Sequence, residues 1–229
     1  MKQIQVVILM LISAVPQCIS AQNVSPNQQS METSAQIAAL KTFWGNAYKA
    51  AQAYFSLPSP ETAKKFYMAL PDKRLPSLDP DGEFRLSDLV FDFWDSGMAK
   101  NFSILKKDME EGEPNAVDVG FRLINISDGG NGEALLYALG HIIDRHPILF
   151  LQKIIAHQGE SEPSALELLD DILDPVAWWE QQQDEAGYPE LLKRRLEIRI
   201  KALESVNDND LKEIRDRCLT ILKNQVHRL

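Results

Sequence analysis

Apolar side chains between Gly132 and His157 recur at spacings of three and four, the period of a helix. This spacing places them along one side of the chain, with polar residues on the other. Pro147 disfavours helical backbone in the residue before it, so we expect one helix to end near His146 and another to begin at Pro147. The second is apolar on most sides, which predicts a central position. The predicted core of this helix pair is Leu136, Leu139, Ile143, Phe150 and Ile154.

The same spacing predicts helices over most of the remaining chain. Prolines and capping residues stand before many of the apolar runs, as they do at helix starts. No segment alternates β-branched and polar residues as a strand would. The predicted fold class is therefore all-α, either a right-angled stack of helices resembling an α-solenoid or an irregular helical bundle. The predicted helices begin near residues 31, 60, 87, 114, 132, 147, 163, 175, 189 and 209.

The beginning of the chain has the pattern of an export signal. Lys2 precedes an apolar run over residues 6–12, and small residues end at Ala21. This pattern predicts a signal peptide over residues 1–21 and a secreted or periplasmic mature protein. Residues 22–34 are polar and are predicted to be a disordered leader. Residues 35–229 are predicted to form one helical domain, with a subdivision near residues 71–87 as the alternative.

The two cysteines lead to different expectations. Cys18 lies in the predicted signal, which leaves Cys218 alone in the mature chain without an intramolecular disulfide. Lipidation of Cys18 would anchor the protein to a membrane, but Pro16 and Gln17 fit such a site poorly, so ordinary cleavage is favoured. Cys218 lies on an apolar helix face and is predicted to be an inert core thiol. Asn-x-Ser sequences would accept glycans in a eukaryotic source at Asn23, Asn101 and Asn125.

Charge is unevenly distributed along a chain whose net charge is −9. Residues 113–188 carry three basic and fourteen acidic side chains, whereas residues 189–229 carry ten basic and seven acidic ones. We expect these two segments to pack together and partly neutralise each other. The acidic balance and the predicted export both disfavour binding to nucleic acid.

Two groups of polar residues have spacings that could support chemistry. Asp170, Asp171 and Asp174 form an Asp-Asp-x-x-Asp sequence, which resembles the magnesium-diphosphate motif of isoprenoid synthases and implies a metal site. Asp174 is better explained as the N-cap of a helix beginning at Pro175, so no metal or cofactor is expected. His141 and Asp144 lie one helical turn apart, a spacing that could serve metal binding or acid-base chemistry. Surface positions are nevertheless favoured for the histidines. His146 is predicted to be an N-cap, and His157 is predicted to lie at a helix C-terminus, where a cation is favoured.

Adjacent tryptophans give the remaining candidate site. Trp178 and Trp179 point about 100° apart on a helix, so one of them could be exposed as a partner contact, although a wide buried face is favoured. The sequence contains no glycine-rich phosphate loop, nucleophile elbow or paired histidine metal motif. We therefore predict an exported, acidic, non-enzymatic interaction or scaffold protein with a protein partner. The alternative is an exported metal-dependent hydrolase or other enzyme that uses the aspartate cluster.

Overall fold

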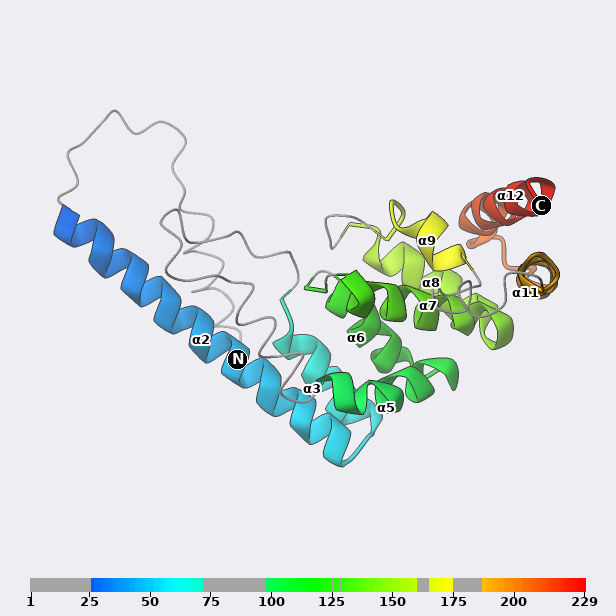
Figure 1. Cartoon of the computed structure of the whole chain (residues 1–229). Coiled ribbons are helices and arrows are strands. Elements are labelled where there is room, and N and C mark those ends of the chain that lie inside the picture. The colour runs from blue at the N-terminus through cyan, green and yellow to red at the C-terminus, as the bar shows by residue number, and fades with distance from the viewer. Residues whose placement is uncertain (1–25, 72–97, 125, 128, 160–164, 175–186) are drawn as a thin grey trace. The chain divides into compact units, whose positions relative to one another are not determined.

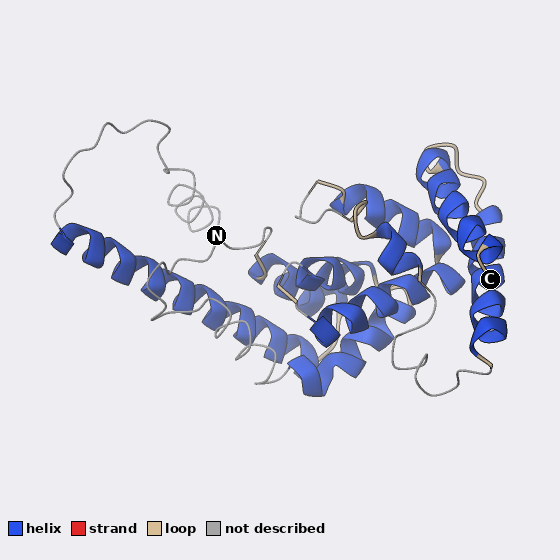
Figure 2. Cartoon of the chain, turned by 45° about the horizontal axis from the view of Figure 1, so that its top comes forward, coloured by secondary structure: helices blue, strands red, loops and turns tan. Residues whose placement is uncertain are grey.

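The structure is a computed structural model that describes residues 26–71, 98–124, 126–127, 129–159, 165–174 and 187–229. Contacts divide the chain into two compact units, residues 1–39 and residues 40–229. The described residues form helices and no strand (Figure 2), which confirms the all-α class, and their packing is consistent with a bundle or a stack. The helices (Figure 1) are α2 Pro26–Ser56, α3 Pro60–Ala69, α5 Ala99–Glu110, α6 Pro114–Ile124, α7 Gly129–Arg145, α8 Pro147–His157, α9 Leu169–Leu173, α11 Tyr188–Glu204 and α12 Lys212–His227.

Helix α2 begins earlier than its apolar pattern predicts. The pattern places the start near Met31, but the helix begins at Pro26, so the last part of the predicted leader, residues 26–34, is helical. Residues 27–34 contain neither proline nor glycine, which permits helix without an apolar face. The predicted signal peptide and the loop over residues 72–87 lie outside the described residues.

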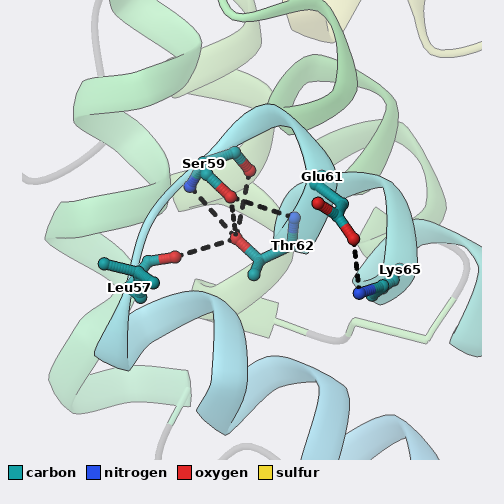
Figure 3. A network of polar contacts seen from close by, with 5 residues as sticks. All are labelled: Leu57, Ser59, Glu61, Thr62 and Lys65. Atoms are coloured by element: carbon teal, nitrogen blue, oxygen red, sulfur yellow. Dashed lines mark hydrogen bonds and ion pairs between the residues drawn. The ribbon is translucent and has the colours of Figure 1, made fainter.

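Helix α3 begins at Pro60, as predicted, and Ser59 and Thr62 form a capping box at its start. The backbone N–H of Thr62 donates to the Ser59 hydroxyl at 3.2 Å, and the backbone N–H of Ser59 donates to the Thr62 hydroxyl at 3.0 Å (Figure 3). The Thr62 hydroxyl also donates to the carbonyl oxygen of Leu57 at 2.9 Å. These bonds satisfy backbone groups that a helix start otherwise leaves unpaired.

The centre of the fold is α7, which contacts α5, α6, α8, α9 and α11. Four of the five predicted core residues are fully buried, and Leu136 is half-buried against the core. The prediction that α8 is enclosed is wrong on one side, because Ile148 and Ile155 are exposed by 48% and 37%. Helix α8 packs on α6, α7, α11 and α12 with its other side.

Two corners of the chain meet at Gly112 and His146. Gly112 has a φ of 82°, and a β-carbon there would lie 2.8 to 2.9 Å from atoms of the His146 ring. Glycine is favoured in this backbone conformation, and here it also gives the imidazole room to pack. His146 occupies the N-cap position of α8 as predicted, but its side chain makes no capping hydrogen bond, since the ring lies over the turn between α5 and α6.

Two further predicted helix starts differ from the structure. Within the described part of the helix predicted from residue 163, only Leu169–Leu173 is helical, after turns at residues 165–167. The last helix, α12, begins at Lys212 rather than near residue 209, with Leu211 at its N-cap, so neither Asp208 nor Asp210 caps it. Asp208 instead accepts a hydrogen bond from the backbone N–H of Asp210 at 2.9 Å, which closes a local turn.

Candidate functional site

A carboxylate on α6 joins two basic side chains of α8. Lys153 Nζ lies 2.6 Å from Asp118 Oδ1 and 2.7 Å from Oδ2. His157 Nε2 lies 2.8 Å from Asp118 Oδ1. The Lys153, Asp118 and His157 side chains are only 17%, 18% and 5% exposed. We call these three residues the Asp118 cluster; they link α6 to the last two turns of α8.

Aromatic rings surround the histidine of this cluster. The His157 ring stacks on Phe121 with centroids 4.8 Å apart and meets the Tyr67 ring edge to face at 6.1 Å. Arg122 lies over the Tyr67 ring and donates to the Tyr67 hydroxyl at 3.0 Å and to the carbonyl oxygen of Leu70 at 3.1 Å. Helix α3 is therefore tied to the same junction as α6 and α8.

The electrostatics of Asp118 favour its ionised form. Burial raises the pKa of this carboxyl. The hydrogen bonds from His157 and Lys153, together with the charges of these two side chains, lower the pKa by more than burial raises it, so the net pKa lies below the ordinary value. A buried carboxylate with two donors is paired rather than isolated, which makes its burial tolerable. The direct effect of the cluster is to hold neighbouring helices together.

A second buried charge joins α7, α9 and α11. Arg199 of α11 is 1% exposed, and its Nη1 donates to the carbonyl oxygens of Ile172 and Leu173 at 3.2 and 3.0 Å. These carbonyls end the short helix α9, where a cation is favoured. Gly140 of α7 lies beneath the guanidinium, because a β-carbon there would come within 2.9 Å of both Nη atoms.

His141 and Asp144, the predicted imidazole and carboxylate pair, border this junction. Asp144 Oδ1 lies 3.7 Å from Arg199 Nε, and Asp144 Oδ2 lies 3.6 Å from His141 Nδ1. Burial lowers the pKa of Arg199 to about 10, although the charges of Asp144 and Asp174 oppose the change. Arg199 thus remains a cation at neutral pH, and the pair with Asp144 joins the acidic middle of the chain to its basic end.

The aspartates of the predicted alternative metal site do not face one direction. Asp170 and Asp171 are exposed on α9, whereas Asp174 follows that helix as its half-buried C-cap. Asp174 contributes negative charge near Arg199 and, after burial, raises the pKa of Tyr188. In the part of the chain that the structure describes, no group of three or more His, Cys, Asp or Glu side chains is placed to hold a metal ion.

The other predicted candidates have different outcomes. Trp178 and Trp179, the predicted partner contacts, lie outside the described residues, as does the start of the helix that Asp174 was predicted to cap. Cys218 is a buried free thiol, which confirms its predicted place in the core. Burial raises its pKa to about 12, so it is a poor nucleophile at neutral pH.

The outward face of α8 differs from that of an ordinary surface helix, although α8 also buries Phe150, Leu151 and Ile154. The residues that it exposes between its ends carry no charge: Ile148, Gln152, Ile155 and Ala156. The two basic residues in its second half, Lys153 and His157, are instead turned toward Asp118. Surface helices ordinarily direct apolar residues inward and charged residues to water. We call this surface the α8 face.

Sequence reasoning missed the Asp118 cluster because it placed His157 at the surface. The structure corrects this expectation, since His157 is 4% exposed. Two signals could have identified the cluster. Asp118 interrupts an apolar run over residues 116–121, and Lys153 and His157 lie one helical turn apart on an otherwise apolar helix. A charged residue within an apolar run indicates a buried partner.

Comparison with known proteins identifies no relative of this chain. No family model matches it, and neither a curated protein nor a solved structure shows significant similarity. Among the described helices, none combines the length and the apolar character that a membrane-spanning helix requires. The functional proposal therefore depends on the residues and contacts described above.

Proposed function

We propose that this chain is an exported, non-enzymatic helical scaffold that binds a partner protein through the α8 face. The observation that carries the proposal is the uncharged outward face of α8, on which Ile148 and Ile155 are exposed while Lys153 is turned toward Asp118. Isoleucines seven positions apart lie on the same side of a helix, as anchors of helix-mediated recognition do. Exposing them to water is unfavourable, and binding a partner would remove that apolar area from water.

The charge of this surface indicates the chemistry of the partner. Nucleic acids and anionic lipids are bound mainly through lysine and arginine. The exposed side chains of the α8 face include neither, and the chain as a whole is acidic. We therefore propose a partner protein that presents an uncharged, apolar segment, with Gln152 able to donate or accept one hydrogen bond within the contact.

The buried charges also support a scaffold. Asp118 and Arg199, two charged side chains of the interior, each join secondary-structure elements through short contacts. Asp118 holds α8, the helix that bears the α8 face, against α6, and Arg199 holds α11 against α9 and α7. A rigid surface loses less conformational entropy on binding than a mobile one.

The test is site-specific crosslinking in the native host. A photoreactive amino acid at position 152 should crosslink one defined protein, whereas the same group at exposed Lys201 of α11 should not. The double variant Ile148→Glu/Ile155→Glu should abolish capture of that protein by placing two charges in the contact. Ile198→Glu is the matched control, because Ile198 is exposed by 46%, close to the 48% of Ile148.

The outcomes separate the surface from the fold. All variants should retain the circular dichroism spectrum and the melting temperature of the wild type, since substitutions of exposed residues usually change stability by only about 0.5 kcal/mol. Undiminished capture by the double variant, or equal loss in Ile198→Glu, would show that the α8 face is not the binding surface.

A further inference from the structure

The carboxylate of Asp118 joins the second half of α8, behind the α8 face, to α6. Lys153 and His157 are separated by one helical turn, and Asp118 is the acceptor for both. His157 is the last residue of α8, so the cluster holds the end of this helix. The end of a helix can open without unfolding the rest, because its final carbonyl groups have no partner within the helix.

We propose that the Asp118 cluster is an acid-sensitive latch, which holds the last turn of α8 against α6 and releases it when Asp118 is protonated. A protonated carboxyl accepts hydrogen bonds less strongly than a carboxylate does, and it carries no negative charge to balance that of Lys153. The ammonium group of Lys153, which is 17% exposed, would then be largely buried without its counter-ion. That arrangement is unfavourable until the last turn moves into water.

The groups around Asp118 are basic, so protonation of Asp118 would remove the negative charge that they contact. From α8 it faces Lys153 and His157; its own helix carries Arg122 one turn further, and α3 contributes Tyr67, which Arg122 contacts. Neutralising Asp118 therefore leaves Lys153 and His157 of α8 without the carboxylate that they share on α6. The packing of His157 on Phe121 would oppose the opening but cannot replace the lost charge.

The direction of the pH dependence follows from linkage. Because the pKa of Asp118 is lowered in the folded chain, its contribution to stability is present above the ordinary pKa of an aspartate, about 4. That contribution is lost as the pH falls through the lower folded value. The latch is therefore closed at neutral pH and opens in acid. Ile155 of the α8 face lies in the same last turn, so opening would also alter the surface on which the proposed function rests.

Hydrogen exchange of individual amides tests the latch without any partner. Between about pH 6 and about pH 3, the protection factors of residues 154–158 should fall by a factor of up to about ten, while those of residues 218–222 in α12 stay unchanged. Asp118→Asn should show low protection in residues 154–158 already at the higher pH and no further loss in acid. Asp216→Asn removes an exposed carboxylate of α12 and should behave as the wild type does.

The outcomes are distinct. Parallel loss of protection in α8 and α12 would indicate global acid unfolding and overturn the latch, as would unchanged protection in α8. The wild-type measurement alone decides this if Asp118→Asn fails to fold. Partner capture by the α8 face at neutral pH tests the proposed function separately, so either proposal can fail while the other stands.

Discussion

Gly140 of α7 lies directly against the carbonyl oxygen of Ile172 at the end of α9. A β-carbon at position 140 would overlap this oxygen and would also crowd the guanidinium of Arg199. The backbone of one helix therefore packs on the end of another without an intervening side chain. This close approach allows Arg199 to reach the carbonyl groups of Ile172 and Leu173 from α11.

Replacing Gly140 by alanine should destabilise the fold. The added methyl group cannot be accommodated by rotating a side chain, because the atom that it meets belongs to the backbone. Overpacking of this kind costs about 1 to 3 kcal/mol, measured as the free energy of unfolding in urea. Gly45→Ala is the matched control, since a β-carbon there would meet nothing within 4 Å, and it should stabilise α2 by about 0.5 to 1 kcal/mol. Equal effects of the two substitutions would contradict the close packing.

Arg199→Met should also lower stability, although methionine fills a similar volume. The substitution leaves the carbonyl oxygens of Ile172 and Leu173 without the guanidinium donor and leaves Asp144 without its nearby cation. The expected loss is about 3 kcal/mol in the free energy of unfolding at neutral pH. Adding Asp144→Leu should recover part of it, because the unpaired carboxylate is then removed. If the single variant were as stable as the wild type, the contacts of Arg199 would not stabilise the packing of α7, α9 and α11.

Cys218 should be unreactive in the folded protein. Its thiol is fully buried and its pKa is raised to about 12, so a disulfide reagent at about pH 8 should modify it only after denaturation. The raised pKa also determines the direction of the pH dependence of stability. The contribution of the thiol is fully present below its ordinary pKa of 9.0 and decreases as the pH rises above that value. Rapid labelling of the native protein, followed by absorbance, would contradict this burial.

Divalent cations should leave the melting temperature unchanged. Asp170 and Asp171 point about 100° apart on α9, and Asp174 is half-buried at its end near Arg199. Three carboxylates in these positions do not converge on one ion. Magnesium, manganese or calcium at millimolar concentration should therefore produce no shift in a thermal melt. An increase of several degrees that disappears in Asp170→Ala would instead support the metal-dependent enzyme.

The mature protein should begin at Gln22. Lys2, the apolar run over residues 6–12 and the small residues ending at Ala21 have the order of a signal peptide and its cleavage site. Mass spectrometry of the protein from its native host would identify this N-terminus. Recovery of intact Met1 from the cytoplasm would contradict export, and a lipid on Cys18 would indicate membrane anchoring.

Local sequence rules predicted where the helices lie better than they predicted which helices contact one another. Pro114 and Pro147 stand at the first positions of α6 and α8 because proline fits the helix start. Apolar periodicity likewise identified Leu139 and Ile143 as core residues. These features depend on neighbours within a few positions, so they can be predicted without knowing the fold.

Contacts between distant segments were not predictable in the same way. Asp118 and His157 are 39 positions apart and meet only once α6 and α8 pack together. His157 was assigned to the surface because a basic residue commonly ends a helix. Asp174 was assigned to the start of the following helix, and its charge near Arg199 depends on α11, whose position no local pattern specifies.

The meeting of Gly112 and His146 has a consequence for the order of folding. It brings together the corner between α5 and α6 and the corner between α7 and α8, within one continuous part of the chain. This contact closes a shorter stretch of chain than contacts of α11 with α7 do, such as that of Arg195 with Tyr137, 58 positions apart, and a shorter loop loses less chain entropy, which favours early formation. We therefore expect α5 to α8 to assemble first, and the α11 and α12 pair to join a surface that already exists.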